Sequence, residues 1–248
     1  MNRIKDYDSL SFDIDRWLKD YYYMYAIKAF VVGVSGGIDS AVVSTLCART
    51  ELPTYVLTMP LHSKAGNTFL SDLHAYQLEK KYSNVTIVNV DLNDTYDKFM
   101  IAVNNNTFTG NKLANANTKS RLRMVSLYQI AGAVGGIVVG TGNKVEDYGI
   151  GFFTKYGDGG VDIAPIADLY KTEVWELGKY LGIDGRIINA APTDGLWDDG
   201  RGDEEQIGAS YEQLEEAMEY GTGNAVDILD EFNRKNKHKM EPIPTFKL

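Results

Sequence analysis

The chain has 248 residues, 44% of them hydrophobic and 24% charged, a composition typical of a soluble globular protein with one large α/β domain or two small ones. Its 25 lysines and arginines against 34 aspartates and glutamates give a formal charge of −9, which argues against a nucleic-acid partner. The single Cys47 excludes an internal disulfide framework and favours a reducing, cytoplasmic compartment, and no apolar run approaches the ~18 residues that would predict a membrane span.

The first predicted element is an amphipathic helix over residues 8–28, where Ile14, Trp17 and Leu18 recur at helical spacing. A β-branched run that starts at Phe30 predicts a buried strand, which ends at a glycine turn. Residues 104–117 are rich in Asn, Gly and Thr and are expected to form a mobile loop or break. Further strands are predicted at 53–59, 85–91, 137–140 and, as a short fifth strand, 161–166; further helices are predicted at 39–49, 68–82, 93–103, 118–134, 172–181, 203–220 and 225–235.

Strands that alternate with helices predict a parallel sheet with right-handed crossovers. Ligands of such sheets bind beyond the carboxyl ends of the strands. Residues 35–40, 59–64 and 141–146 each follow a predicted strand, so we expect these three segments to share one crevice.

The turn after the first strand, within VVGVSGGIDSAVVS at 31–44, has the layout of an anion site. A strand, a glycine turn and a helix aim backbone N–H groups and a helix N-terminus at phosphate. Gly36 and Gly37 leave no Cβ in the way of a close ligand, and Ser35 and Ser40 add hydroxyl donors. Asp39 would repel phosphate unless it holds a divalent metal that bridges to the phosphates. The turn matches neither the Walker loop nor the dinucleotide fingerprint, and the alternative is a glycine turn used only for packing.

Other charged residues follow later strands and helices. Glu146 can face Asp39 across the crevice, where two carboxylates and the ligand's phosphates would suit Mg²⁺; the alternative is a solvated loop acid. Arg121 and Arg123 alternate on one helix, so one can reach a ligand while the other forms a structural ion pair. Four further cations are ordinary when taken singly, namely Lys155, Lys171, His238 and Lys239.

The pattern Ser-Gly-Gly-x-Asp-Ser after a strand resembles the pyrophosphate loop of the N-type ATP pyrophosphatases. The segments NTKSRLRM, GTGNKVED, GFFTKYGDGGVDIAPIADLYK and APTDGLW, and the late His238-Lys239, are similar to ammonia-dependent NAD synthetase, in that order, from about residue 33 to 239. The resemblance implies one Rossmann-like (adenine nucleotide α-hydrolase-like) α/β domain over 1–248, with a parallel five-stranded sheet flanked by helices. It also implies a homodimer and no glutaminase domain.

The resemblance carries residue roles with it. It implies catalytic roles for Asp39, Lys171 and Thr193, and Mg²⁺ binding by Asp39 and Glu146, with Asp147 as a weaker metal candidate. The family's basic ATP contact after the second strand has no clear counterpart in PLHSKAGNTF, where Lys64 is only a guess. The implied ATP contacts are Gly33, Val34, Ser35, Gly36, Gly37, Ile38, Asp39, Ser40, Thr141, Lys171 and Thr193, and the implied contacts to deamido-NAD⁺ are Arg121, Lys155, Asp162, His238 and Lys239.

The implied reaction turns a nicotinate carboxylate into an amide in NAD biosynthesis. The carboxylate attacks the α-phosphorus of ATP, pyrophosphate leaves, and ammonia displaces AMP from the acyl-adenylate. Three alternatives stay open. A tRNA-modifying relative would need a basic surface and cysteines, an amidotransferase synthetase subunit would take ammonia from a separate protein, and a nucleotide sensor would have no use for paired metal ligands.

Overall fold

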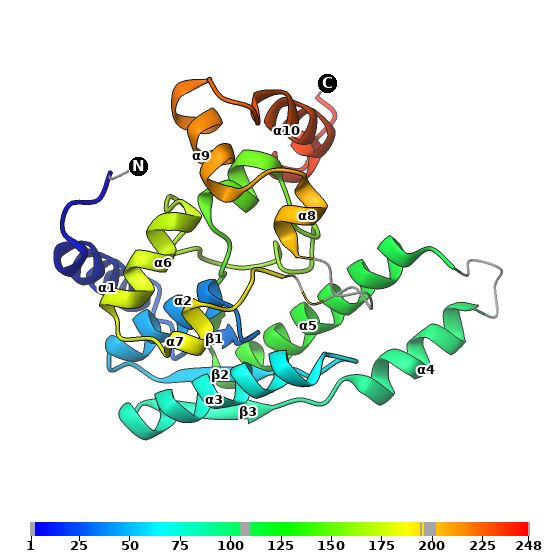
Figure 1. Cartoon of the computed structure of the whole chain (residues 1–248). Coiled ribbons are helices and arrows are strands. Elements are labelled where there is room, and N and C mark those ends of the chain that lie inside the picture. The colour runs from blue at the N-terminus through cyan, green and yellow to red at the C-terminus, as the bar shows by residue number, and fades with distance from the viewer. Residues whose placement is uncertain (1–2, 105–109, 194, 196–201, 248) are drawn as a thin grey trace.

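The computed structural model describes residues 3–104, 110–193, 195 and 202–247. Its centre is a parallel sheet in which the described strands stand in the order β3-β2-β1-β4 (Figure 1). The register pairs Phe30 of β1 with Thr54 of β2 on one side and with Ile137 of β4 on the other. Successive strands run outward from β1 to β3, and β4 then returns to the other side of β1, so a topological switch point lies between β1 and β4. The strands are β1 (Phe30–Gly33), β2 (Thr54–Thr58), β3 (Val85–Asn89) and β4 (Ile137–Val138).

Helices cover both faces of this sheet, and a further group lies over one edge. The elements are α1 (Tyr7–Met24), α2 (Ile38–Arg49), α3 (Ala65–Lys81), α4 (Asn93–Asn104), α5 (Lys112–Val134), the π-helical turn η1 (Lys144–Ile150), α6 (Lys171–Tyr180), α7 (Gly185–Ile188), α8 (Asp203–Ile207), α9 (Tyr211–Tyr220) and α10 (Val226–Met240). Among the described helices, none is both long enough and apolar enough to cross a membrane.

The alternation of side chains along β1 divides the core into two layers. Phe30 and Val32 are fully buried against α1, α2 and α6, whereas Val31, between them in sequence, packs with α4 and α5 on the opposite face. A strand with apolar residues on both faces has to be covered on both faces, which the helices accomplish here. The layered α/β architecture expected from the alternating pattern is therefore confirmed.

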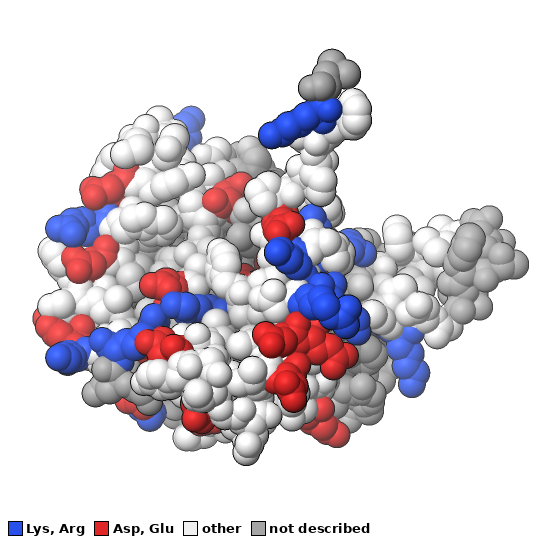
Figure 2. All heavy atoms as spheres, turned by 90° about the horizontal axis from the view of Figure 1, so that it is seen from above, with Lys and Arg blue, Asp and Glu red and all other residues white. Residues whose placement is uncertain are grey.

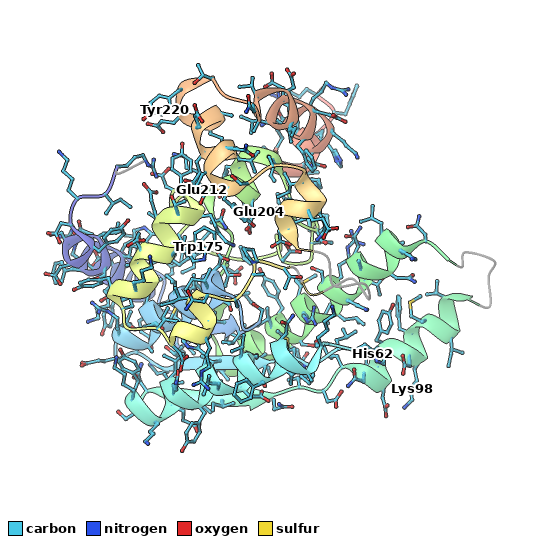
Figure 3. All side chains as sticks on the ribbon, in the orientation of Figure 1. His62, Lys98, Trp175, Glu204, Glu212 and Tyr220 are labelled. Atoms are coloured by element: carbon cyan, nitrogen blue, oxygen red, sulfur yellow. The ribbon has the colours of Figure 1, made fainter. Side chains whose placement is uncertain are left out.

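A separate apolar cluster joins the C-terminal helices to η1. Val145 and Ile150 of η1 are buried with Tyr211 and Leu214 of α9, and α10 packs on the same turn. Trp175 of α6 and Glu204 of α8 both contact Tyr211 (Figure 3). Helices α8, α9 and α10 are called the C-terminal cap below. They pack on the turn that carries Glu146, so they bear directly on the site described below.

The prediction of a fifth strand at 161–166 is wrong, because the described sheet has four strands. Ile163 forms only an isolated parallel bridge to Val139. The Asp162 carboxylate accepts the Val138 N–H at 2.8 Å, which takes a donor that a strand would use, and Pro165 has no N–H to extend the ladder.

Several helix boundaries also differ from expectation, among them the ends of α1 at Met24 and of α10 at Met240, and two of the differences have a clear local cause. The long helix begins at Lys112 rather than at 118, because the Asn111 side chain caps it by accepting the Ala114 N–H; residues 105–109 of the expected loop lie outside the described part. The helix expected at 203–220 is two helices. Gly208, with a φ of +87°, ends α8, and Ser210 caps α9.

Candidate active site

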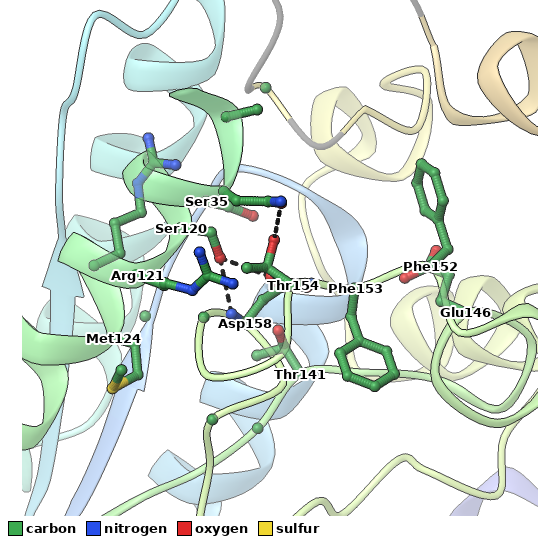
Figure 4. Close-up of a pocket in the computed structure, with 18 of the residues that line it drawn as sticks. Ser35, Ser120, Arg121, Met124, Thr141, Glu146, Phe152, Phe153, Thr154 and Asp158 are labelled. Carbon is green, nitrogen blue, oxygen red and sulfur yellow. Dashed lines mark hydrogen bonds between the residues drawn. The ribbon is translucent and has the colours of Figure 1, made fainter. Parts of the chain in front are cut away.

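A cavity of about 840 Å³ opens at the carboxyl ends of β1, β2 and β4. Ser35 follows β1, Met59 and Ser63 follow β2, and Thr141 and Glu146 follow β4, and all five line the cavity (Figure 4). The expectation that three segments after strands share one crevice is confirmed. Residues of α5 and α10 complete the walls, so the cavity lies between the sheet and the C-terminal cap.

Hydrogen bonds of Ser35 and Ser40 fix the conformation of the glycine turn after β1. The Ser35 N–H donates to Ser40 Oγ at 3.1 Å, Ser40 Oγ donates to the Gly37 carbonyl at 3.0 Å, and the Gly37 N–H donates to Ser35 Oγ at 3.2 Å. Gly36 has a φ of +89°, and a Cβ there would lie 2.8 Å from the Asn67 carbonyl oxygen. The N-terminus of α2 has no side-chain cap, so it presents backbone donors to an anion.

A buried lysine lies between two carboxylates at the centre of the site. Lys171 Nζ is 2.6 Å from Asp39 Oδ2 and 2.9 Å from Glu146 Oε1. The Lys171 side chain is 4% exposed, against 17% and 18% for the two acids. Lys171 is the first residue of α6, where a cation opposes the helix dipole, so these acids compensate both its burial and its position.

The pKa values of the three groups reflect this arrangement. Burial alone lowers the pKa of Lys171, but the charges of Asp39 and Glu146 outweigh burial and raise it. Burial raises the pKa of Asp39 despite the ammonium beside it. Burial also acts to raise the pKa of Glu146, but the charge of Lys171 and several hydrogen bonds together lower it. The site therefore holds Lys171 charged, in ion-pair contact with two acids.

Two further side chains hold these acids, and both were missed from the sequence. Asn143 Nδ2 donates to Asp39 Oδ1 at 3.0 Å, while its Oδ1 caps η1 by accepting the Val145 and Glu146 N–H groups. The Tyr211 hydroxyl donates to Glu146 Oε1 at 2.7 Å. Asn143 stands in the Thr-Gly-Asn break after β4, which is a recognisable cap signal, whereas Tyr211 resembles any apolar residue of an amphipathic helix.

Two weaker candidates from the sequence, Asp147 for the metal and Lys64 for ATP, are not among the described residues that line the cavity. The carboxylate of Asp147 packs against Gly142, outside the described cavity lining, and its pKa is raised well above the usual value by burial and then by the charge of Glu146. Lys64 is exposed at the start of α3 and is not among the described lining residues. The basic group at the end of β2 comes instead from α5, since Arg123 donates to the Met59 carbonyl at 3.3 Å.

Of the residues proposed to contact the second substrate, four line the cavity at one end, namely Arg121, Lys155, His238 and Lys239. Arg121 donates to the Lys155 carbonyl at 3.3 Å, and Lys155 Nζ donates to the His238 carbonyl at 3.0 Å. Lys239 Nζ donates to the carbonyls of Gly151 and Phe153 at 2.6 and 2.8 Å. These contacts join α5, the glycine-rich segment 149–160 and α10 into one wall of the cavity.

Asp162 is the exception. Its carboxylate accepts the Val138 N–H at 2.8 Å and the Tyr128 hydroxyl at 3.0 Å, and it is not among the described residues that line the cavity. Thr141 and Thr193 do line the cavity, together with Lys171. The Thr193 hydroxyl accepts the Gly195 N–H at 3.2 Å.

The glycine-rich segment 149–160 is anchored on α5. Asp158 Oδ1 accepts the Ser120 hydroxyl at 2.7 Å and the Thr154 N–H at 3.0 Å, and Asn117 Oδ1 accepts the Thr154 hydroxyl at 2.8 Å (Figure 4). Burial raises the pKa of Asp158, which lines the cavity.

Figure 2 shows the molecule from above, and on this face acidic and basic side chains are interspersed.

Comparisons with known proteins agree on one family. The sequence model described as NAD synthase matches residues 11–243. The chain is 39% identical over 227 residues to an NH(3)-dependent NAD(+) synthetase of Carboxydothermus hydrogenoformans, covering 90% of each chain. Among solved structures, it is similar to an NMN synthetase from Francisella tularensis (TM-score 0.89, 31% identity, 99% of this chain and 100% of that one) and to an NAD+ synthetase from Burkholderia pseudomallei (TM-score 0.76, 26% identity, 95% and 90%).

Proposed function

The chain belongs to the NAD synthase family, and from this premise we propose how its site carries out the reaction. It is an enzyme of NAD biosynthesis that forms an amide with ammonia at the expense of ATP. We propose that the acid amidated is deamido-NAD⁺ and that an acyl-adenylate is the intermediate. The observation that carries the proposal is a buried lysine in ion-pair contact with two carboxylates, at a cavity that Ser35, Glu146 and Lys171 line.

In this proposal the turn after β1 binds the phosphates that leave. Ser35 lines the cavity, and Ser40 and the uncapped N-terminus of α2 belong to the same turn. Donors fixed before the reaction stabilise charge that develops on departing pyrophosphate without a reorganisation cost. An acid with no good leaving group thereby becomes an activated acyl group.

Asp39 and Glu146 fit a divalent cation, because their oxygens already converge on one cation, the ammonium of Lys171. No group of three or more His, Cys, Asp or Glu side chains with metal-binding geometry occurs among the described residues, so phosphate and water oxygens would complete the shell. We propose Mg²⁺, which when bound would neutralise charge on the leaving pyrophosphate. Lys171 would then be available to stabilise charge at the α-phosphorus.

The acid substrate is proposed to bind at the opposite end of the same cavity. Arg121, Lys155, His238 and Lys239 gather there and would attract the phosphates of a nucleotide. Because Arg121, Lys155 and Lys239 each donate to backbone carbonyls of this wall, substrate phosphates would meet an ordered surface. The positioning of two nucleotides in line supplies much of the rate in reactions of this kind.

The test is a product assay with ATP, Mg²⁺, ammonium and deamido-NAD⁺. We expect NAD⁺, AMP and pyrophosphate in equal amounts, and loss of all three in a folded Asp39→Ala variant. ADP in place of AMP would contradict the proposal, as would substantial turnover by the variant.

A second candidate acid is nicotinate mononucleotide, which would give NMN on amidation. The high structural similarity to an NMN synthetase, over 99% of this chain, favours its inclusion. The two substrates share the nicotinate carboxylate and differ only in the adenylyl half. Measurement of kcat/KM for both acids under saturating ATP decides between them, since the preferred substrate is the one with the larger value.

We also propose that the enzyme is a homodimer. The pair α4 and α5 extends beyond the sheet and exposes Phe99, Ile101, Leu113 and Val125 (Figure 1). An apolar surface of this kind is typical of a subunit interface. Light scattering on the purified chain should give twice the monomer mass of 27.6 kDa, and a monomeric mass at micromolar concentration would contradict this.

A further inference from the structure

Tyr211 is the first residue of α9, and it reaches from the C-terminal cap into the charged centre of the site. It is fully buried. Its ring meets the ring of Trp175 edge to face at 5.9 Å, and its backbone N–H donates to Glu204 Oε1 at 2.9 Å. The contact from α6 holds the ring, and the contact from α8 holds the backbone of the same residue.

The side chain of Tyr211 touches two of the three charged groups at once. Its hydroxyl donates to Glu146 Oε1 at 2.7 Å, and the same oxygen accepts from Lys171 Nζ at 2.9 Å. Lys171 Nζ also lies 4.9 Å from the centre of the Tyr211 ring, within the range of a cation–π contact. One aromatic side chain thus holds both the acid and the lysine.

We propose that Tyr211 is a positioning residue for the metal-binding carboxylate of Glu146. The inference rests on the proposed function, in which Lys171 leaves both acids when Mg²⁺ and ATP bind. Glu146 then loses the ammonium that now holds its Oε1, while the Tyr211 hydroxyl stays in place. Tyr211 therefore keeps the carboxylate aimed toward Asp39 during the exchange, and it links the C-terminal cap to the phosphate-binding turn.

Partners of this kind, which hold a metal ligand without touching the metal, typically contribute 10- to 100-fold to metal affinity. Tyr211→Phe removes only the hydroxyl and keeps the ring against Lys171 and Trp175. A matched control is Tyr170→Phe. Tyr170 is also buried, belongs to the same apolar cluster and donates its hydroxyl to a glutamate, Glu219 Oε2 at 2.9 Å, away from the charged centre.

The experiment measures binding of Mn²⁺, a probe for Mg²⁺, by electron paramagnetic resonance in the presence of α,β-methylene ATP, which cannot be cleaved between these phosphates. We expect Tyr211→Phe to weaken Mn²⁺ binding by roughly 10-fold or more, with Tyr170→Phe within about twofold of the parent chain. In a Glu146→Ala background, loss of the Tyr211 hydroxyl should have no further effect, because its target is gone.

The outcomes separate this inference from the proposed function. If Asp39→Asn weakens Mn²⁺ binding but Tyr211→Phe does not, the inference is overturned and the metal assignment stands. Equal losses in the two tyrosine variants would show a structural effect only, and would also overturn it. If the parent chain and Asp39→Asn bind Mn²⁺ equally, the metal assignment itself fails, and the inference fails with it.

Discussion

Replacement of Lys171 by methionine tests the charge balance of the site before any ligand binds. The side chain keeps most of its volume and loses the ammonium, so two carboxylates that are 17% and 18% exposed are left without their shared cation. Loss of one partner of a buried ion pair destabilises proteins by roughly 3–5 kcal/mol. The partial exposure of both acids places Lys171→Met near the lower limit.

For a chain of this size, a loss of about 3 kcal/mol corresponds to a fall in Tm of roughly 6–12 °C. Asp39→Asn provides the contrast. It leaves Lys171 paired with Glu146 alone, in a neutral pair, and keeps an amide oxygen near the ammonium. We therefore expect a markedly smaller change in Tm for Asp39→Asn than for Lys171→Met.

The double variant makes the prediction sharper. Lys171→Met leaves two unpaired acids, and the addition of Asp39→Asn removes one of them. The double variant should accordingly be more stable than Lys171→Met alone, although it differs from the parent chain at two positions. Thermal unfolding followed by circular dichroism, with a chelator and without nucleotide, measures all four chains. A double variant less stable than Lys171→Met, or a Lys171→Met variant with an unchanged Tm, would refute the electrostatic reasoning.

Three other changes probe separate parts of the molecule. Gly36→Ala meets the Asn67 carbonyl oxygen at 2.8 Å in a left-handed conformation, so it should weaken ATP binding and lower the unfolding free energy by at least about 1–2 kcal/mol; unchanged ATP affinity by calorimetry would contradict this. Burial lowers the pKa of His74 from 6.5 to about 4, so the parent chain should lose roughly 3 kcal/mol of stability as the pH falls from 6.5 to 4, and denaturant titrations should show no such loss in His74→Gln. Lys239→Met frees two carbonyls of the glycine-rich wall and should raise KM for the acid substrate roughly tenfold, by about 1.4 kcal/mol, while an equal rise in KM for ATP would place Lys239 elsewhere.

The parts of the site that the sequence could predict are those built within one local stretch. The turn after β1 combines its strand, its glycines and its serines within ten residues, and its hydrogen bonds close within the same stretch. Glu146 could be placed near Asp39 because both follow neighbouring parallel strands. In each case a local pattern, or the rule for carboxyl ends of strands, fixes the position.

Side chains brought together by packing between distant elements could not be predicted in this way. Tyr211 lies 65 residues from Glu146, and nothing in its helical pattern distinguishes a hydroxyl that faces a carboxylate from one that faces solvent. Arg123 reaches the end of β2 only because α5 crosses beside it. Asp162 shows the converse: a matching residue type does not fix where its side chain points, and here it is hydrogen-bonded to the backbone of β4.

The carboxylate of Asp39, inside the turn after β1, is stabilised by its neighbours. Asp39 lies at the start of α2, where the helix dipole favours it, and Asn143 and Lys171 take up both of its oxygens. Lys171 is thus the cation that Asp39 and Glu146 share. Under the proposed function, an incoming nucleotide would bring its own cation and anionic phosphates, so the ammonium would lose its place between the acids and gain a new partner. In this scheme the exchange leaves no buried charge unpaired at either stage, which is a physical reason for the fold to place one lysine between two acids.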